Sequence, residues 1–87
     1  MRWRLRIDPR AERELASLPD DVRRRIARRI DALQIEPRPR GCQKLVGRDG
    51  VYRLRAGDYR ILYRIADAVL VVMVIRIGHR HELTYIL

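Results

Sequence analysis

The C-terminal half carries the segment that most constrains the fold, VYRLRAGDYRILYRIADAVLVVMVIRI, which predicts three strands in succession. Apolar and basic residues alternate over 51–55 and over 59–65, a period of two that is typical of strands with one buried face. Turn residues separate these strands at 56–58, and AD turns the chain again at 66–67. A third strand is expected at 68–77. Strands joined by such short turns pair side by side, so we expect an antiparallel meander.

The third strand of this meander is apolar on both of its faces, which favours an interior position in the sheet. The segment GCQKLVG at 41–47 predicts a further, brief strand. At the N-terminus RWRLRI alternates strictly, with Trp3, Leu5 and Ile7 on one side and arginines on the other. This pattern predicts a strand with a basic outer face that joins the same sheet.

Two helices are expected between the first strand and the meander. Asp8 before Pro9 is a typical start for a helix over 9–18. A second helix is expected over 20–35, with an amphipathic stripe at Val22, Ile26, Ile30 and Leu33. The order β-α-α-β-β-β predicts an α+β fold, a helical hairpin packed on a mainly antiparallel twisted sheet, as a single domain over 1–87.

The charge is strongly positive, with a formal net charge of +9 from nineteen arginines, one lysine (Lys44) and eleven acidic residues. Such a balance indicates a polyanionic partner: RNA, DNA, a membrane surface or an acidic protein. The single cysteine, Cys42, allows no internal disulfide, as expected in a reducing cytoplasm. The longest apolar run, AVLVVMVI, is too short to cross a bilayer, and the N-terminus has no apolar stretch typical of a signal peptide.

The meander predicts a cluster of basic side chains. Arg53 and Arg55 share one face of their strand, and Arg60 follows the next turn, so the three come close in a hairpin. The neighbouring strand leads into His79, Arg80 and His81 in the terminal sequence IGHRHELTYIL. Taken one at a time, such arginines are ordinary exposed positions. Together they indicate an anion site, because clustered like charges destabilise a fold unless an anion joins them.

The residue types in this cluster suit RNA. Arginine binds phosphate through a planar fork, histidine and tyrosine stack on unpaired bases, and histidine can transfer protons near neutral pH. RNA carries its own nucleophile, the 2′-OH, so a ribonuclease of this kind needs neither a cofactor nor a metal. The spacing of the two histidines, with no evident third ligand, argues against a zinc site.

The sequence resembles the RelE/ParE toxin superfamily, on the RelE side, over nearly the whole chain. The most specific elements are YRLRAGDYRILYRI and the terminal GHR, which an acidic residue and a tyrosine follow. The resemblance implies a toxin of a type II toxin–antitoxin system that is silenced by a cognate antitoxin. It also implies an endoribonuclease that enters the ribosomal A site, where the 16S rRNA lies, and cuts mRNA there by 2′-OH attack. Its catalytic residues would be Arg60, Arg80, His79, His81 and Tyr85, and its RNA- and phosphate-binding residues Arg53, Arg55, Lys44 and Arg64.

The chain departs from the family pattern at two places. Arg53 and Arg55 replace lysines of the best-known RelE members, and arginine is a poor general base, so His79, His81 or a neighbouring residue is expected to take that role. In many members the terminal tyrosine lies one position earlier, where this chain has Thr84.

Two other functions remain open. A ParE-like toxin would share the fold and inhibit DNA gyrase without a nuclease site. A non-catalytic homologue would bind nucleic acid through charge alone, with salt-dependent affinity and no cleavage.

Overall fold

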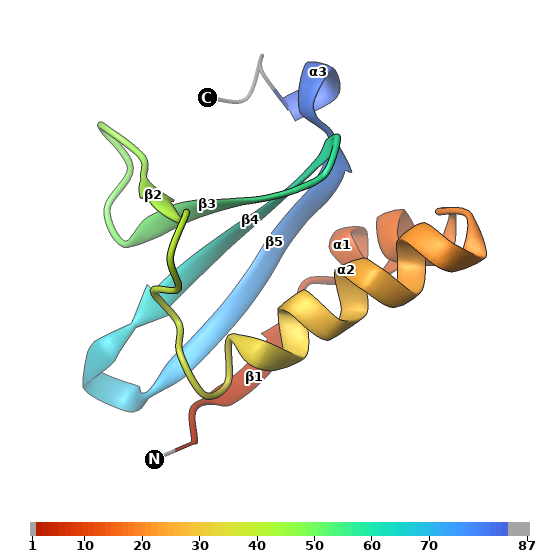
Figure 1. The fold of residues 1–87 in the computed structure, drawn as a ribbon. Coiled ribbons are helices and arrows are strands. Elements are labelled where there is room, and N and C mark those ends of the chain that lie inside the picture. Colours follow the sequence, from red (N-terminus) through yellow and green to blue (C-terminus); the bar gives the residue numbers. More distant parts are fainter. Residues whose placement is uncertain (1, 84–87) are drawn as a thin grey trace.

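The computed structural model describes residues 2–83, which form one five-stranded sheet with two helices on one face (Figure 1). The elements are β1 (Arg4–Ile7), α1 (Pro9–Ala16), α2 (Asp20–Ala32), β2 (Gln43–Lys44), β3 (Val51–Ala56), β4 (Tyr59–Ala66), the 3₁₀ turn η1 (Asp67–Val69), β5 (Val71–His79) and α3 (Arg80–Leu83). The predicted α+β fold, with its helical hairpin and mainly antiparallel sheet, is confirmed.

The strands lie in the order β1-β5-β4-β3-β2. The meander β3-β4-β5 is antiparallel, as predicted, and β2 adds to it antiparallel to β3. Among the described strands only β1 and β5 pair in parallel, and the helical hairpin, β2, β3 and β4 lie between them in the chain. β5 therefore has a neighbour on each side, which confirms its predicted interior position.

Several boundaries differ from those predicted. The predicted helices over 9–18 and 20–35 end at Ala16 and Ala32. The last strand begins at Val71 and not at residue 68, because Leu70 adopts a left-handed conformation (φ 54°) after η1 and breaks the strand. A bulge shifts the β4–β5 register after Leu62. Strand β5 continues past this bulge to His79 and not only to the predicted residue 77.

The main core lies between the helices and one face of the sheet. The predicted α2 stripe supplies Ile26, Ile30 and Leu33, all at most 1% exposed, and Val22 packs at its margin. The sheet supplies alternate residues of β3, β4 and β5, among them the fully buried Tyr63. On the opposite face of β5, Val71 and Met73 are only half-buried. This strand is therefore apolar on both faces although these residues of its second face are not fully buried.

The segment between α2 and β2, which we call the connector, is held against the sheet by contacts with two tyrosines. The Tyr63 hydroxyl donates to the Pro37 carbonyl oxygen (2.8 Å). Arg38 donates to the Tyr52 hydroxyl (3.0 Å), lies over the Tyr52 ring, and forms a two-pronged ion pair with Asp67 (2.9 and 3.2 Å). These contacts join segments up to 29 residues apart and hold the connector across the end of the sheet.

Glu14 of α1 secures the end of β5 that leads to the terminal cluster. β1 pairs with β5 only as far as Ile7 and Val74, which leaves the next part of the β5 edge without a strand partner. There the Glu14 carboxylate accepts from the Ile77 backbone N–H (2.9 Å) and from the Arg76 guanidinium (3.0 Å). One side chain thus replaces the missing strand and neutralises a half-buried charge.

Candidate phosphate-binding site

Three arginines meet on the sheet face that the helices leave uncovered. Arg55 pairs directly with Arg60 across the β3–β4 hairpin, and Arg53 lies two residues before Arg55, on the same face. On its other side Arg60 pairs with Gly78 of β5, which has no side chain to lie beside the guanidinium. The register of the hairpin therefore produces the predicted cluster.

These arginines line a hollow of about 270 Å³, together with Gly41 and Gln43. Contacts within it orient two of the guanidiniums. Arg53 donates to the Gln43 side-chain oxygen, and the Arg55 Nε donates to the Gly57 carbonyl oxygen (3.0 Å). The hollow presents guanidinium groups and an amide, which are the groups that bind a phosphate through several hydrogen bonds.

Burial and neighbouring charges both act on the pKa of Arg60. Burial lowers the pKa of its guanidinium, and repulsion from Arg53, Arg55 and Arg80 lowers it further. Arg80 thus acts on the same cluster from the start of α3, where its backbone N–H donates to the Asp58 carbonyl oxygen (2.9 Å) at the hairpin turn. None of the five residues that line the hollow is acidic, so a bound anion would relieve the mutual repulsion of the arginines.

The structure places the two histidines apart from this hollow. His79 pairs with Tyr59 on the neighbouring rung of the ladder, where side chains point to the helix-covered face. Its ring lies edge-on to Tyr59 (centroids 5.6 Å apart) and stacks with His81 (5.0 Å, 25°). The sequence predicted a strand over 68–77 that leads into both histidines. In the structure β5 ends at His79 and His81 belongs to α3.

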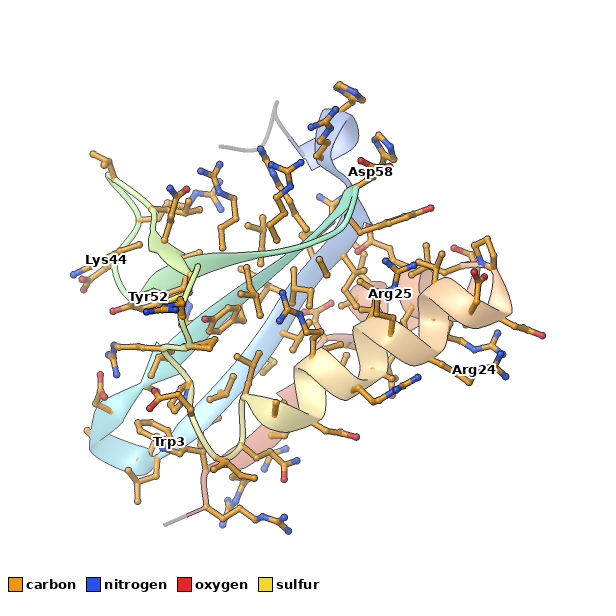
Figure 2. The ribbon with its side chains drawn as sticks, in the orientation of Figure 1. Trp3, Arg24, Arg25, Lys44, Tyr52 and Asp58 are labelled. Carbon is orange, nitrogen blue, oxygen red and sulfur yellow. The ribbon has the colours of Figure 1, made fainter. Side chains whose placement is uncertain are left out.

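Two further predicted residues lie away from the hollow. Lys44 pairs with Tyr52, so its side chain lies on the opposite face of the sheet from Arg53. Lys44 also lies far from the hairpin turn at Asp58, which precedes Arg60 by two residues (Figure 2). Arg64 shares the face of Arg60 but lies four residues along β4, where it donates to the Asp49 carbonyl oxygen (3.3 Å). Tyr85 lies outside the described residues.

Sequence reasoning missed the residues that support the cluster. Arg29 of α2 donates to the Arg55 carbonyl oxygen (2.8 Å) and so holds the strand end that displays the Arg55 guanidinium. Gln43 enters the site only because β2 pairs with β3. The first contact spans 26 residues and has no local pattern. For Gln43, the predicted strand at 41–47 is the one sequence signal.

Within residues 2–83, no group of three or more His, Cys, Asp or Glu side chains is arranged to hold a metal ion. In the same part of the chain, no helix has the length and apolar character needed to cross a membrane.

Comparisons with known proteins show the family and the fold. Residues 5–84 match the model of a family described as the ParE toxin of the type II toxin–antitoxin system parDE. Among curated proteins no sequence gives a significant match.

Similar solved structures come from bacteria and archaea. The RelE–RelB complex of Pyrococcus horikoshii contains a chain with 33% identity and a TM-score of 0.81, over 92% of this chain and 97% of that one. The RelBE2 toxin–antitoxin complex of Mycobacterium tuberculosis gives 31% and 0.78, over 92% and 100%. The intact RelBE complex of E. coli gives 32% and 0.76, over 88% and 95%.

Proposed function

This chain belongs to the ParE toxin family of type II toxin–antitoxin systems, within the RelE/ParE superfamily, and from that premise we propose that it inhibits translation as an endoribonuclease that cuts mRNA in the ribosomal A site. The observation that carries the proposal is the convergence of Arg53, Arg55 and Arg60 on a hollow with no acidic lining residue. The charge of Arg80 acts on Arg60 as well. A scissile phosphate gains negative charge during cleavage, and guanidiniums held in place stabilise that charge.

The proposed reaction uses the nucleophile of the RNA itself. The 2′-oxygen attacks the adjacent phosphorus as its proton leaves, and the bond to the 5′-oxygen breaks as that oxygen takes up a proton. The products are a 2′,3′-cyclic phosphate and a 5′-hydroxyl. Arg60 is assigned to the scissile phosphate because it lies between Arg55 and Gly78, and Arg80 to the charge that develops beside it. The ribosome would align the mRNA, which places this activity in the cytoplasm.

A cognate antitoxin is the proposed protein partner. The solved relatives include toxin–antitoxin complexes from three organisms. The net charge of +9 favours an antitoxin with an acidic toxin-binding segment.

Inhibition of DNA gyrase is the second candidate, and the ParE toxin family model favours it. The two activities share a fold and differ in target. One experiment separates them, in which the purified chain is added to ribosomes programmed with a defined mRNA and, in parallel, to a gyrase supercoiling reaction. The proposal expects mRNA cleavage at the A site and unchanged supercoiling. Loss of supercoiling with intact mRNA would replace it with the gyrase function.

A further inference from the structure

The hollow that the arginines line contains one uncharged polar side chain, that of Gln43. β2 pairs with β3 so that Gln43 lies opposite Arg53 and shares its face of the sheet. Arginine side chains only donate hydrogen bonds, and Gly41 has no side chain. Among the five residues that line the hollow, Gln43 is therefore the only one whose side chain can accept a hydrogen bond.

The contact with Arg53 fixes the orientation of the Gln43 amide. Because a guanidinium only donates, the amide atom that faces Arg53 is the carbonyl oxygen Oε1 and not the NH₂ group. A carbonyl oxygen has two lone pairs, and within residues 2–83 Arg53 is the one donor to Gln43 Oε1. The second lone pair remains for a ligand that enters the hollow.

The main chain on both sides of Gln43 is held by hydrogen bonds. Before it, the Cys42 N–H donates to the Pro39 carbonyl oxygen (3.1 Å) of the connector. After it, the Leu45 N–H donates to the Val51 carbonyl oxygen (2.9 Å) at the start of β3. The exposed Gln43 side chain is thus presented to the hollow from an anchored strand.

An RNA phosphate that enters the hollow brings a hydroxyl with it. The 2′-hydroxyl of a nucleotide lies beside its own 3′-phosphate, so a phosphate bound by the arginines places this hydroxyl at the wall of the same hollow. A hydroxyl donates one hydrogen bond, which a guanidinium cannot accept. Gln43 Oε1 supplies the acceptor that the arginines lack.

We propose that Gln43 Oε1 accepts a hydrogen bond from the 2′-hydroxyl of the nucleotide whose phosphate the arginines bind, and that this contact favours RNA over chains without that hydroxyl. The proposal rests on the proposed ribonuclease function and names the residue that orients the attacking hydroxyl. An amide is too weak a base to take the proton, so Gln43 binds the substrate and transfers no proton.

The first test compares two oligonucleotides of one sequence, an oligoribonucleotide and its 2′-fluoro counterpart, by fluorescence anisotropy without ribosomes. Fluorine keeps an RNA-like sugar conformation but has no hydrogen to donate. The contact predicts that the wild type binds the RNA roughly fivefold more tightly, and that this ratio falls to about one in Gln43→Leu. Arg53 binds the phosphates of both oligonucleotides, so a displaced guanidinium would weaken both and leave the ratio unchanged.

Two further variants complete this test. Gln43→Glu keeps an acceptor at the same position and should retain the ratio, although its charge should weaken the binding of both oligonucleotides. Gln34→Leu makes the same substitution outside the hollow and should bind as the wild type does. Because Gln43 is exposed, its variants should fold, which circular dichroism verifies. An equal ratio in the wild type and Gln43→Leu, or a wild type that does not distinguish the two oligonucleotides, would overturn the proposal.

Single-turnover cleavage on programmed ribosomes separates this contact from the ribonuclease proposal. Gln43→Leu should cut mRNA roughly tenfold more slowly than the wild type, because its 2′-hydroxyl is no longer oriented, and Gln34→Leu should keep the wild-type rate. A wild-type rate for Gln43→Leu would overturn the contact. If the wild type cuts no mRNA at all, the ribonuclease proposal fails, and the two affinities alone decide whether Gln43 binds the hydroxyl.

Discussion

Glu14 joins α1 to β5, the strand that leads to His79, Arg80 and His81, so its removal tests how this strand is held in place. Substitution Glu14→Ala removes the acceptor of the Ile77 N–H and leaves the Arg76 guanidinium, whose side chain is only 18% exposed, without its carboxylate. A hydrogen bond to a charged group contributes about 1.5–3 kcal/mol, and an unsatisfied buried donor costs about 1–3 kcal/mol. Because the Glu14 side chain is 23% exposed and water can replace part of the loss, we expect a net destabilisation of about 2–3 kcal/mol.

Urea unfolding followed by circular dichroism measures this effect. With a slope of about 1 kcal/mol per molar urea for a chain of this size, the midpoint should fall by roughly 2 M or more. The double variant Glu14→Ala/Arg76→Ala should recover part of the loss, since it removes the charge that was left without a partner. Exposed Glu12 on the same helix provides the matched control, Glu12→Ala. A change below about 0.5 kcal/mol for Glu14→Ala would refute the role of Glu14 as the substitute for a strand partner.

Three other variants test contacts of the sheet. Tyr63→Phe leaves the Pro37 carbonyl without its donor and should cost about 1–2 kcal/mol in thermal unfolding. Burial raises the pKa of the Tyr63 hydroxyl, so stability should also decline above about pH 10, where the unfolded tyrosine ionises, and Tyr63→Phe should weaken that decline. The Arg38 hydrogen bond lowers the pKa of Asp67, so this pair stabilises the fold above about pH 4. Its contribution fades as the pH falls below the normal aspartate pKa. Asp67→Asn should therefore make stability depend less on pH in the acid range. Arg60→Gln removes like-charge repulsion and should raise the melting temperature by a few degrees at low salt, an increase that 0.5 M salt should reduce; a lower melting temperature would show that the cluster is not repulsive.

The meander and the helical hairpin could be predicted from sequence because their signals are local. Alternation over β3 and β4, and the stripe Ile26, Ile30 and Leu33, fix which side of each element faces the core. The hairpin register then brings Arg55 opposite Arg60. The turn has two residues, Gly57 and Asp58, one fewer than the predicted turn at 56–58, and Gly57 has φ +62°.

The position of the histidines could not be predicted in the same way. Alternation along a strand would place His79 and His81 on one face, but the strand ends at His79, and the register gives His79 the face opposite Arg60. Long-range contacts such as Glu14 with Ile77, or Arg29 with Arg55, depend on how α1 and α2 lie against the sheet. Periodicity within a single element carries no information about that arrangement.

Single-turnover cleavage of mRNA on programmed ribosomes by the Arg60→Gln variant tests the central claim most directly. Arg64→Gln is the matched control, because Arg64 lies on the same strand and face but outside the hollow. If the arginine cluster stabilises the cleavage transition state, Arg60→Gln should cut about 10²–10³-fold more slowly than the wild type, and Arg64→Gln should cut at a rate close to it. Equal rates for Arg60→Gln and the wild type would contradict the account.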